Sequence, residues 1–378
     1  VEGGAALLAA LTLAHPLQPF SPAYFPVRAG SSPLFTYAHE WRGPAVPDAG
    51  GDDAAILAPA QRDEPLGLRE LGDFLKDPVK AFFRRRLGVG FERDDPVADD
   101  HEPFALDGLA RWRFQDELIQ AQVRALGDGH AVEAARAARL VHIRGRGELA
   151  AGAFGDLMAF ALEDGMDELF ARYRNALERW PAADQGEHEV RFETTADGTS
   201  LALADWLAGV RRDGDGRPAR VVLDSNDLIK DRHYRYDKLI HHWVAHLGAH
   251  RAVGPLTTLV VGKKADVELP PLDVAEAEAH LHRLLGAWAE GMRRPLPLAP
   301  RTAFAWLAER GATGEAGAVA AAVPSAKVAG EYDGAFKKVG EVEASAYLQR
   351  AYPCFEALLA SGEFPVLAEA LLRPLWRA

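Results

Sequence analysis

The clearest pattern of apolar and polar positions lies in the middle of the chain. The two kinds of residue alternate over residues 188–194 and again over 199–210, and the turn residues Asp197 and Gly198 separate the two runs. Alternation with a period of two, interrupted by Asp-Gly, predicts a β-hairpin. A short run rich in β-branched residues follows at 220–224. We therefore expect the three runs to form a three-stranded meander.

The hydrophobic period changes on both sides of this meander. Downstream, apolar residues recur at helical spacing from Leu239 to Leu247, and residues 256–261 return to strand composition. Upstream, one apolar stripe from Phe154 to Trp180 predicts a single long helix. The expected order of helix, three strands, helix and strand is similar to the skeleton of the restriction-endonuclease-like, or PD-(D/E)XK, nuclease core. The fold class predicted is thus α/β, with a mixed sheet flanked by helices and added helical segments.

Other helices are expected upstream of this core. One should stop before Pro78, and the next should start at that proline and bury Val79, Phe82, Phe83 and Leu87. A further helix follows residue 109, and its inward-facing residues are expected to be Trp112, Leu118, Ile119 and Val123.

Three parts are expected along the chain. Residues 1–64 form an extended segment that ends in a linker rich in Pro, Gly and Asp, residues 65–310 form the nuclease-like domain with its core at about 153–263, and residues 311–378 form a helical cap. The sequence begins without methionine, inside a run rich in Ala and Leu. We therefore expect it to be a fragment of a longer polypeptide.

Composition narrows the class of protein. The chain has 378 residues, of which 48% are hydrophobic and 26% charged, as is ordinary for a soluble protein. Its one cysteine, Cys354, excludes a disulfide framework and cannot by itself hold a zinc or iron–sulfur site, which needs about four ligands. No apolar run approaches the roughly 18 residues of a membrane span. The location expected is therefore the cytoplasm, without membrane contact.

The charge pattern bears on nucleic-acid binding. A net charge of −12 argues against a general nucleic-acid coat, but basic residues cluster locally and permit a basic channel in an acidic protein. Simple solvation of the surface, or favourable placement at a helix C-terminus, is the alternative explanation for these clusters. The residues that we predict to contact a DNA backbone are Arg211, Arg212, Lys230, Arg232, Arg235, Arg84 and Arg85.

A set of short motifs, in order, carries a resemblance to a known family. The motifs are residues 15–21, 37–41, 78–87, 102–104 with 106–109, 152–155, 206–207 and 243–247. Together they resemble the C-terminal part of the exodeoxyribonuclease V gamma-subunit (RecC) family, from about His15 to about Trp306. Beyond Gly311 the likeness is weak.

The resemblance implies a function that composition does not. Members of this family work in a heterotrimeric helicase–nuclease that resects double-strand breaks, and they end in a nuclease-like domain that has lost its active site. That domain lies where the duplex enters and helps to part the strands. The implied partners are a helicase–nuclease (beta) subunit, a second helicase (alpha) subunit, and double-stranded or forked DNA.

The nuclease positions themselves are degenerate. Active members of this fold place an aspartate near the end of the second strand and Asp/Glu-x-Lys on the third, because carboxylates hold a divalent ion and a lysine helps to activate water. Here Ala208 stands at the first position, and Asp224 and Asn226 stand where Asp-x-Lys belongs. We therefore expect no catalytic residue, metal or cofactor. The alternative pairs Asp224 or Asp227 with Lys230.

Three histidines at four-residue spacing offer another candidate metal site. His242, His246 and His250 would lie along one side of the predicted helix. The structural alternative is that His242 and His246 are half-exposed polar residues beside the core-facing Trp243. We expect this alternative, and hence no metal.

The function predicted is a non-catalytic, nuclease-like scaffold that guides DNA and docks the motor subunits of the complex, so that the chain itself is no enzyme although the assembly is. Two rivals remain open. One is an active metal-dependent nuclease that uses Asp224, and the other is a protein-docking module without DNA contact.

Overall fold

The chain falls into two units, Val1–Ile56 and Leu57–Ala378. Its computed structural model describes residues 8, 11–18, 21–25, 32–37, 56–91, 105–196, 198–230, 233–313, 325–336 and 338–378. In the first unit, Pro22–Tyr24 form one turn of 3-10 helix, and the Tyr24 hydroxyl donates to the Pro16 carbonyl at 3.1 Å. The sheet and the helices that cover it lie in the second unit. The domain boundaries expected from the sequence stay predictions.

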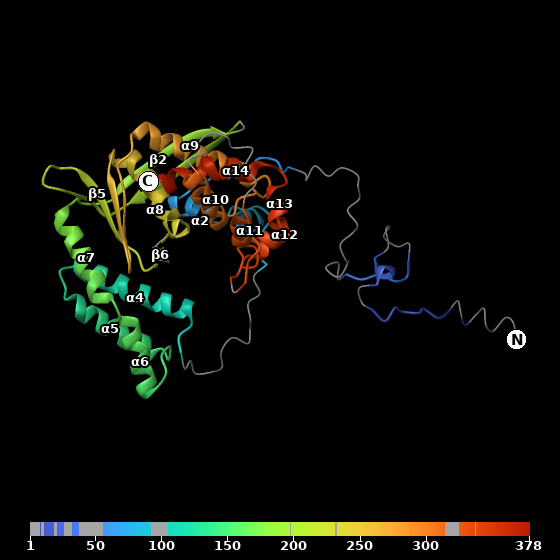
Figure 1. Ribbon diagram of the computed structural model, residues 1–378, viewed down its shortest axis with the longest axis horizontal. Helices are drawn as coiled ribbons and strands as arrows, with labels where there is room; N and C mark the ends of the chain where they lie inside the picture. The colour runs from blue at the N-terminus through green and yellow to red at the C-terminus, as the bar shows by residue number, and fades with distance from the viewer. Residues whose placement is uncertain are drawn as a thin grey trace. The chain divides into compact units, whose positions relative to one another are not determined.

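A five-stranded mixed sheet forms the centre of the second unit (Figure 1). In spatial order its strands are β1 (Ala182–Ala183), β4 (Val210–Arg212), β5 (Pro218–Leu223), β8 (Thr257–Val261) and β9 (Asp266–Leu269). Strands β5 and β8 run parallel, whereas the other neighbours run antiparallel. Parallel neighbours need a crossover connection, which α8 (Tyr236–Val253) supplies. The prediction of an α/β fold with a mixed sheet flanked by helices is confirmed.

A group of helices lies on one side of the sheet, and the last of them in sequence packs against β5 and β8 (Figure 1). Its members are α4 (Gly108–Gly127), α5 (Val132–Gly145), α6 (Gly152–Glu163) and α7 (Met166–Arg179). Alternate residues of β5, namely Ala219, Val221 and Leu223, share a buried core with Leu118 of α4 and Leu169 of α7. The period of two in β5 therefore directs these side chains toward this group of helices.

A second and larger layer covers the opposite face. Its helices are α2 (Leu68–Lys76), α3 (Pro78–Ala81), α8, α9 (Val274–Gly291), α10 (Pro300–Thr313), α11 (Ala326–Tyr332), α12 (Ala346–Ala351), α13 (Phe355–Leu359), α14 (Glu363–Leu367) and α15 (Arg373–Arg377), with π-helical turns at Phe82–Arg86 and Ala368–Leu372. Val260 of β8 belongs to this core, together with Trp243, Trp288 and Trp306. Because β8 contributes to both cores, it is buried on both faces, as parallel strands usually are.

The predicted hairpin forms, but the predicted meander is wrong. Strands β2 (His188–Ala196) and β3 (Thr199–Leu207) pair with each other as a separate two-stranded sheet. The run expected at 199–210 breaks at Ala208 and Gly209, and Gly209 has a φ of +80°, which glycine adopts most readily. The chain then resumes as β4, which pairs with β5. A second small hairpin joins β6 (Ile229–Lys230) and β7 (His233–Tyr234).

The predicted long helix over 154–180 is also wrong as one element. It is divided into α6 and α7 at Asp164 and Gly165, where Gly165 has a φ of +75°. The apolar stripe continues across the break because Met158, Leu162 and Met166 are all buried. Phe154 does not belong to it, since its side chain is 59% exposed.

Two further predictions of burial fail. The helix break at Pro78 is confirmed, with Asp77 accepting a hydrogen bond from the Lys80 amide at 2.9 Å, and Val79 and Phe82 are buried. Leu87, however, lies just after the π-helical turn and is 44% exposed. Trp112 in α4 is 39% exposed, because the core-facing side of this helix passes through Phe114 and Leu118 instead. The sequence also predicts a weakly ordered segment of small residues at 311–322. Residues 311–313 end α10, and the rest of this segment lies outside the described residues.

Candidate functional site

Asp224 stands directly after β5, at the position expected for a nuclease carboxylate. Its Oδ2 accepts a hydrogen bond from His242 Nε2 at 2.6 Å. Its Oδ1 accepts from both the backbone amide and the side-chain amide of Asn226, each at 2.7 Å. The side chains of Asp224 and His242 are 10% and 15% exposed. All of these contacts are local to the end of β5 and the first half of α8.

The electrostatics of Asp224 follow from these contacts. Burial by itself would raise the pKa of its carboxyl group. The hydrogen bond and charge of His242, together with the two N–H donors of Asn226, outweigh burial and hold the pKa below its ordinary value. Asp224 is therefore an ionised carboxylate whose lone pairs already face donors within the protein.

The other two positions predicted for a nuclease site do not complete a metal site. Ala208 is exposed between β3 and β4 and offers a methyl group. The Asn226 amide is turned toward Asp224, as a donor. Across the described part of the chain, no three His, Cys, Asp or Glu side chains lie close enough together to hold a metal ion. The donor set around Asp224 thus does not fit a divalent ion.

The three histidines predicted as a candidate metal site have separate roles on α8. The expectation that His246 is half-exposed is wrong, because it is fully buried between Thr258 Oγ1 at 2.8 Å and the Pro270 carbonyl at 3.2 Å. Burial, with the nearby His250 and Arg220, lowers the pKa of His246 to about 3. His250 is buried as well, and its Nδ1 donates to the His246 carbonyl at 2.8 Å. These two side chains fasten α8 to β8 and to the segment before α9.

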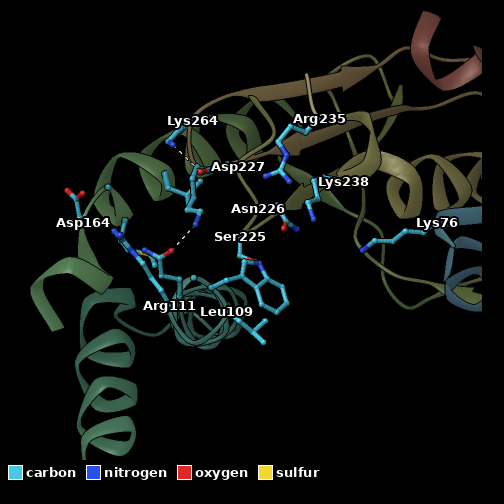
Figure 2. Close-up of a pocket in the computed structure, with 17 residues that line it drawn as sticks. Lys76, Leu109, Arg111, Asp164, Ser225, Asn226, Asp227, Arg235, Lys238 and Lys264 are labelled. Carbon is cyan, nitrogen blue, oxygen red and sulfur yellow. Dashed lines mark hydrogen bonds and ion pairs between the residues drawn. The ribbon is translucent and has the colours of Figure 1, made fainter. Parts of the chain in front are cut away.

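A cleft opens beside Asn226 (Figure 2). Its volume is about 750 Å³. The residues that line this basic pocket, as we call it, are Lys76, Gly108, Leu109, Arg111, Trp112, Gln115, Asp164, Gly165, Met166, Leu169, Ser225, Asn226, Asp227, Arg235, Lys238, Lys263 and Lys264. Six of them are cationic and two are acidic, so the local charge is opposite to that of the whole chain.

The cations of the basic pocket come from separate elements. Lys76 ends α2, Arg111 lies in the first turn of α4, and Arg235 and Lys238 flank the start of α8. Lys263 and Lys264 follow β8 after the intervening Gly262. Since β5 and β8 are parallel, their carboxyl ends meet at one edge of the sheet, which places Ser225 to Asp227 beside the two lysines. This edge is where ligands bind in many α/β folds.

The pocket cations hold few protein partners. Lys264 Nζ lies 3.0 Å from Asp227 Oδ2, Lys263 Nζ donates to Gln115 Oε1 at 2.8 Å, and Lys238 Nζ lies 3.7 Å from Asp237 Oδ2. Burial lowers the pKa of Lys238, and the positive charges of Lys76 and Arg235 lower it further. Burial, Arg111 and Lys264 likewise lower the pKa of Lys263. Burial is thus the main cause of both lowered pKa values, and six cations against two acidic groups give the cleft a net positive charge.

The residues predicted to contact DNA are dispersed. Arg211 donates to the carbonyls of Trp180 and Pro181 at 2.6 and 2.8 Å, and Arg212 pairs with Asp184 at 2.9 Å. Lys230 is exposed on β6, and Arg232 lies outside the described residues. The two upstream residues lie in the π-helical turn after α3, where Arg85 pairs with Glu70. Among the described members of the set, Arg235 is the one that lines the basic pocket. Their contact with DNA stays a prediction.

The sequence reasoning missed most of the basic pocket. One signal was available, because Lys263 and Lys264 lie just after a strand that is parallel to the one preceding Asp224. Lys76, Arg111 and Trp112 had no such signal. They reach the cleft through the packing of α2 and α4, which the hydrophobic pattern does not specify.

Comparisons with known proteins agree on one family. The model of the RecC C-terminal domain matches residues 63–311. The RecBCD enzyme subunit RecC of Escherichia coli K12 is 28% identical over 312 residues, covering 81% of this chain and 25% of that protein. The same subunit of Mycobacterium tuberculosis H37Rv is 26% identical over 321 residues, covering 79% and 26%. The Haemophilus influenzae subunit is 30% identical over 120 residues, covering 30% and 10%.

The chain spans about a quarter of the length of the Escherichia coli and Mycobacterium relatives. Among solved structures, the crystal structure of SSO0001 aligns with 56% of this chain and 82% of its own at 15% identity, with a TM-score of 0.21 that is too low to support an argument. None of the described helices is long and apolar enough to cross a membrane. From the match to the family model and the alignment with RecC of Escherichia coli, we conclude that the chain belongs to the RecC family and corresponds to its C-terminal domain.

Proposed function

We propose that this chain is a non-catalytic, nuclease-like scaffold within a bacterial, cytoplasmic helicase–nuclease complex, where it guides DNA, helps to separate its strands and docks the motor subunits. Its relatives carry the name of a RecBCD enzyme subunit. The proposal includes descent from the PD-(D/E)XK fold. The order α7, β2–β3 hairpin, β5, α8 and β8 supports that origin, as does a carboxylate directly after β5.

The single observation that carries the proposal is the state of Asp224. In a nuclease the corresponding carboxylate turns toward a divalent ion and acts with a second carboxylate and a lysine. Here its oxygens accept hydrogen bonds from His242 and Asn226, and Ala208 offers no oxygen. The carboxylate is present at the expected position, but its hydrogen bonds join the turn after β5 to His242 of α8.

Guidance of DNA is supported by the basic pocket next to this position. A cleft with six cations can attract a phosphate backbone even though the whole chain is acidic. Docking of protein partners is supported by α6. Leu157 and Phe160 on this helix are 65% and 75% exposed, which is unusual for large apolar side chains so close together.

The test of the non-catalytic role uses the assembled complex with the full-length subunit, in which the nuclease of the partner subunit has been disabled by mutation. Forked DNA should stay uncut in the presence of magnesium, both with the native subunit and with Asp224→Ala. Cleavage that needs magnesium and disappears in Asp224→Ala would favour the active-nuclease alternative, whose one supporting observation is the retained carboxylate.

The test of DNA guidance compares two charge-reducing variants in the same complex. Lys230→Gln/Arg235→Gln removes two predicted backbone contacts, and Lys327→Gln/Arg350→Gln removes two exposed cations on α11 and α12. For forked duplex, the slope of log affinity against log salt should become shallower by about 1.8 in the first variant, at roughly 0.9 per phosphate contact, and should not change in the second. Equal slopes in all three complexes would favour a docking module without DNA contact.

A further inference from the structure

The charge distribution at the end of β5 and β8 differs in kind from that of a metal-dependent nuclease. Such a site is built around carboxylates, and the ion that they hold, with one lysine beside it, supplies the positive charge that meets the phosphate. Here the positive charge belongs to the protein. Lys238, Lys263 and Lys264 line the same cleft as Asn226, while Asp224 is engaged by His242. A phosphate that entered this cleft would meet ammonium groups directly.

The pocket lysines are suited to an anion because their local partners are weak. Lys76 is exposed and has no ion pair or hydrogen bond to any residue that the structure describes. Lys238 lies 3.7 Å from Asp237, beyond hydrogen-bond distance. Lys264 pairs at 3.0 Å with Asp227, yet its side chain is 67% exposed, and such surface pairs contribute little. A phosphate can therefore engage these three groups without breaking a strong contact. Lys263 donates one hydrogen bond to Gln115 Oε1 at 2.8 Å, and the other N–H donors of its ammonium group are left for a phosphate.

The acidic groups around the cleft do not offset the cations. Asp164 and Asp227 line it, and Asp227 already pairs with Lys264. Two of the lysines have lowered pKa values, mainly because burial disfavours their charged form; repulsion from neighbouring cations adds to this effect, and Asp237 and Asp227 oppose it. A bound anion would relieve that repulsion.

A partly exposed aromatic side chain lies beside the cations. Trp112 lines the basic pocket, is 39% exposed, and follows Arg111 in sequence on α4. Leu109, which is 72% exposed, adds a second apolar side chain to the lining of the same pocket. Aromatic faces next to cationic groups are the usual platform for unpaired bases, since a base within a duplex is already stacked on its neighbours.

We propose that the basic pocket binds a segment of single-stranded DNA without a metal ion, with a backbone phosphate among Lys238, Lys263 and Lys264 and an adjacent base stacked on Trp112. This inference rests on the proposed function and deepens it, because it names the form of DNA that the former nuclease cleft takes. The volume of about 750 Å³ lies within the range of small-ligand sites and suits a short unpaired segment. No bond is formed or broken in this step.

The experiment again uses the assembled complex with the full-length subunit, now bound to forked DNA that carries 5-iodo-2′-deoxyuridine at successive positions of each single-stranded arm. Irradiation should crosslink one arm to the peptide that contains Trp112, and the crosslink should persist when EDTA replaces magnesium. Trp112→Leu should abolish this crosslink, whereas Trp206→Leu, which removes an exposed tryptophan on β3, should leave it intact.

Affinity for the same fork supplies a second readout. In Lys238→Gln/Lys264→Gln the slope of log affinity against log salt should become shallower by about 1.4, at roughly 0.7 per single-strand phosphate contact. Lys327→Gln/Arg350→Gln is the charge-matched control and should leave the slope unchanged. Trp112→Leu should weaken binding about fivefold or more with no change of slope. Assembly and thermal unfolding of each variant complex establish that these effects do not arise from misfolding.

The outcomes separate this inference from the function on which it rests. Crosslinks to other residues of this domain, with the native slope in Lys238→Gln/Lys264→Gln, would overturn the pocket and leave DNA guidance standing. Absence of crosslinks from the whole domain, with the native slope in Lys230→Gln/Arg235→Gln, would overturn both. A crosslink to Trp112 that requires magnesium would overturn the metal-free mode of binding.

Discussion

Replacement of Asp224 by alanine should destabilise the chain much more than replacement of the nearby Asp227. Asp224 accepts three hydrogen bonds at 2.6–2.7 Å, and its side chain is 10% exposed. Hydrogen bonds to a charged group are worth about 1.5–3 kcal/mol each, and loss of one member of a buried pair costs about 3–5 kcal/mol. Because water can reach part of the site, we expect Asp224→Ala to lower the free energy of unfolding by about 3 kcal/mol.

The matched control is Asp227→Ala. Asp227 makes an ion pair with Lys264, and the two side chains are 36% and 67% exposed. A surface pair of this kind contributes about 0–1 kcal/mol. Urea unfolding of the 378-residue chain, followed by the fluorescence of buried tryptophans such as Trp243, measures both variants. Equal losses in the two variants would refute the structural role assigned to Asp224.

The effect of Asp224→Ala should also depend on pH. The pKa of Asp224 in the folded chain is lowered, which means that the folded state binds this proton less readily than the unfolded state does. The stabilisation is therefore complete above the unfolded pKa of about 3.9 and declines as the pH falls through the lowered folded pKa. The difference in stability between the native chain and Asp224→Ala should shrink below about pH 4. A difference that stays constant down to pH 2 would contradict the assigned hydrogen bonds.

Two further predictions concern the frame around the site. Burial lowers the pKa of His246 to about 3, so between about pH 6.5 and pH 3 this side chain is protonated in the unfolded chain but not in the folded chain. The free energy of unfolding should therefore fall by roughly 1.4 kcal/mol per pH unit over this range. His246→Gln should flatten this pH dependence in urea titrations. Gly165→Ala should cost about 1–2 kcal/mol because Gly165 has a φ of +75°. A matched Gly286→Ala inside α9, where a methyl group meets no atom within 4 Å, should not destabilise the chain, and equal losses at both glycines would show that φ is not the cause.

Local patterns predicted the sheet elements well. Alternation identified the β2–β3 hairpin and helical spacing identified α8, because each of these elements carries a period in its sequence. The β-branched composition of its residues identified β5. The failures occurred where one residue changes the direction of the chain. Gly165 and Gly209 each have a positive φ, and a hydrophobic stripe that continues across them does not reveal the bend.

The site was predictable only in part. Asp224 and Asn226 could be placed because they directly follow a strand, and the expected loss of a nuclease site rests on residue identity alone. The basic pocket could not be assembled from the sequence, since Lys76, Trp112 and Lys238 converge through packing between elements far apart in the chain. The burial of His246 was missed because its partner Thr258 lies on a neighbouring strand, and the sequence of the helix alone does not indicate that contact.

Binding of manganese to the chain, measured by electron paramagnetic resonance with and without Asp224→Ala, tests most directly whether a nuclease frame is kept here without its metal site. The account predicts the same weak titration for both proteins. A manganese site that is present in the native chain and lost in Asp224→Ala would contradict it.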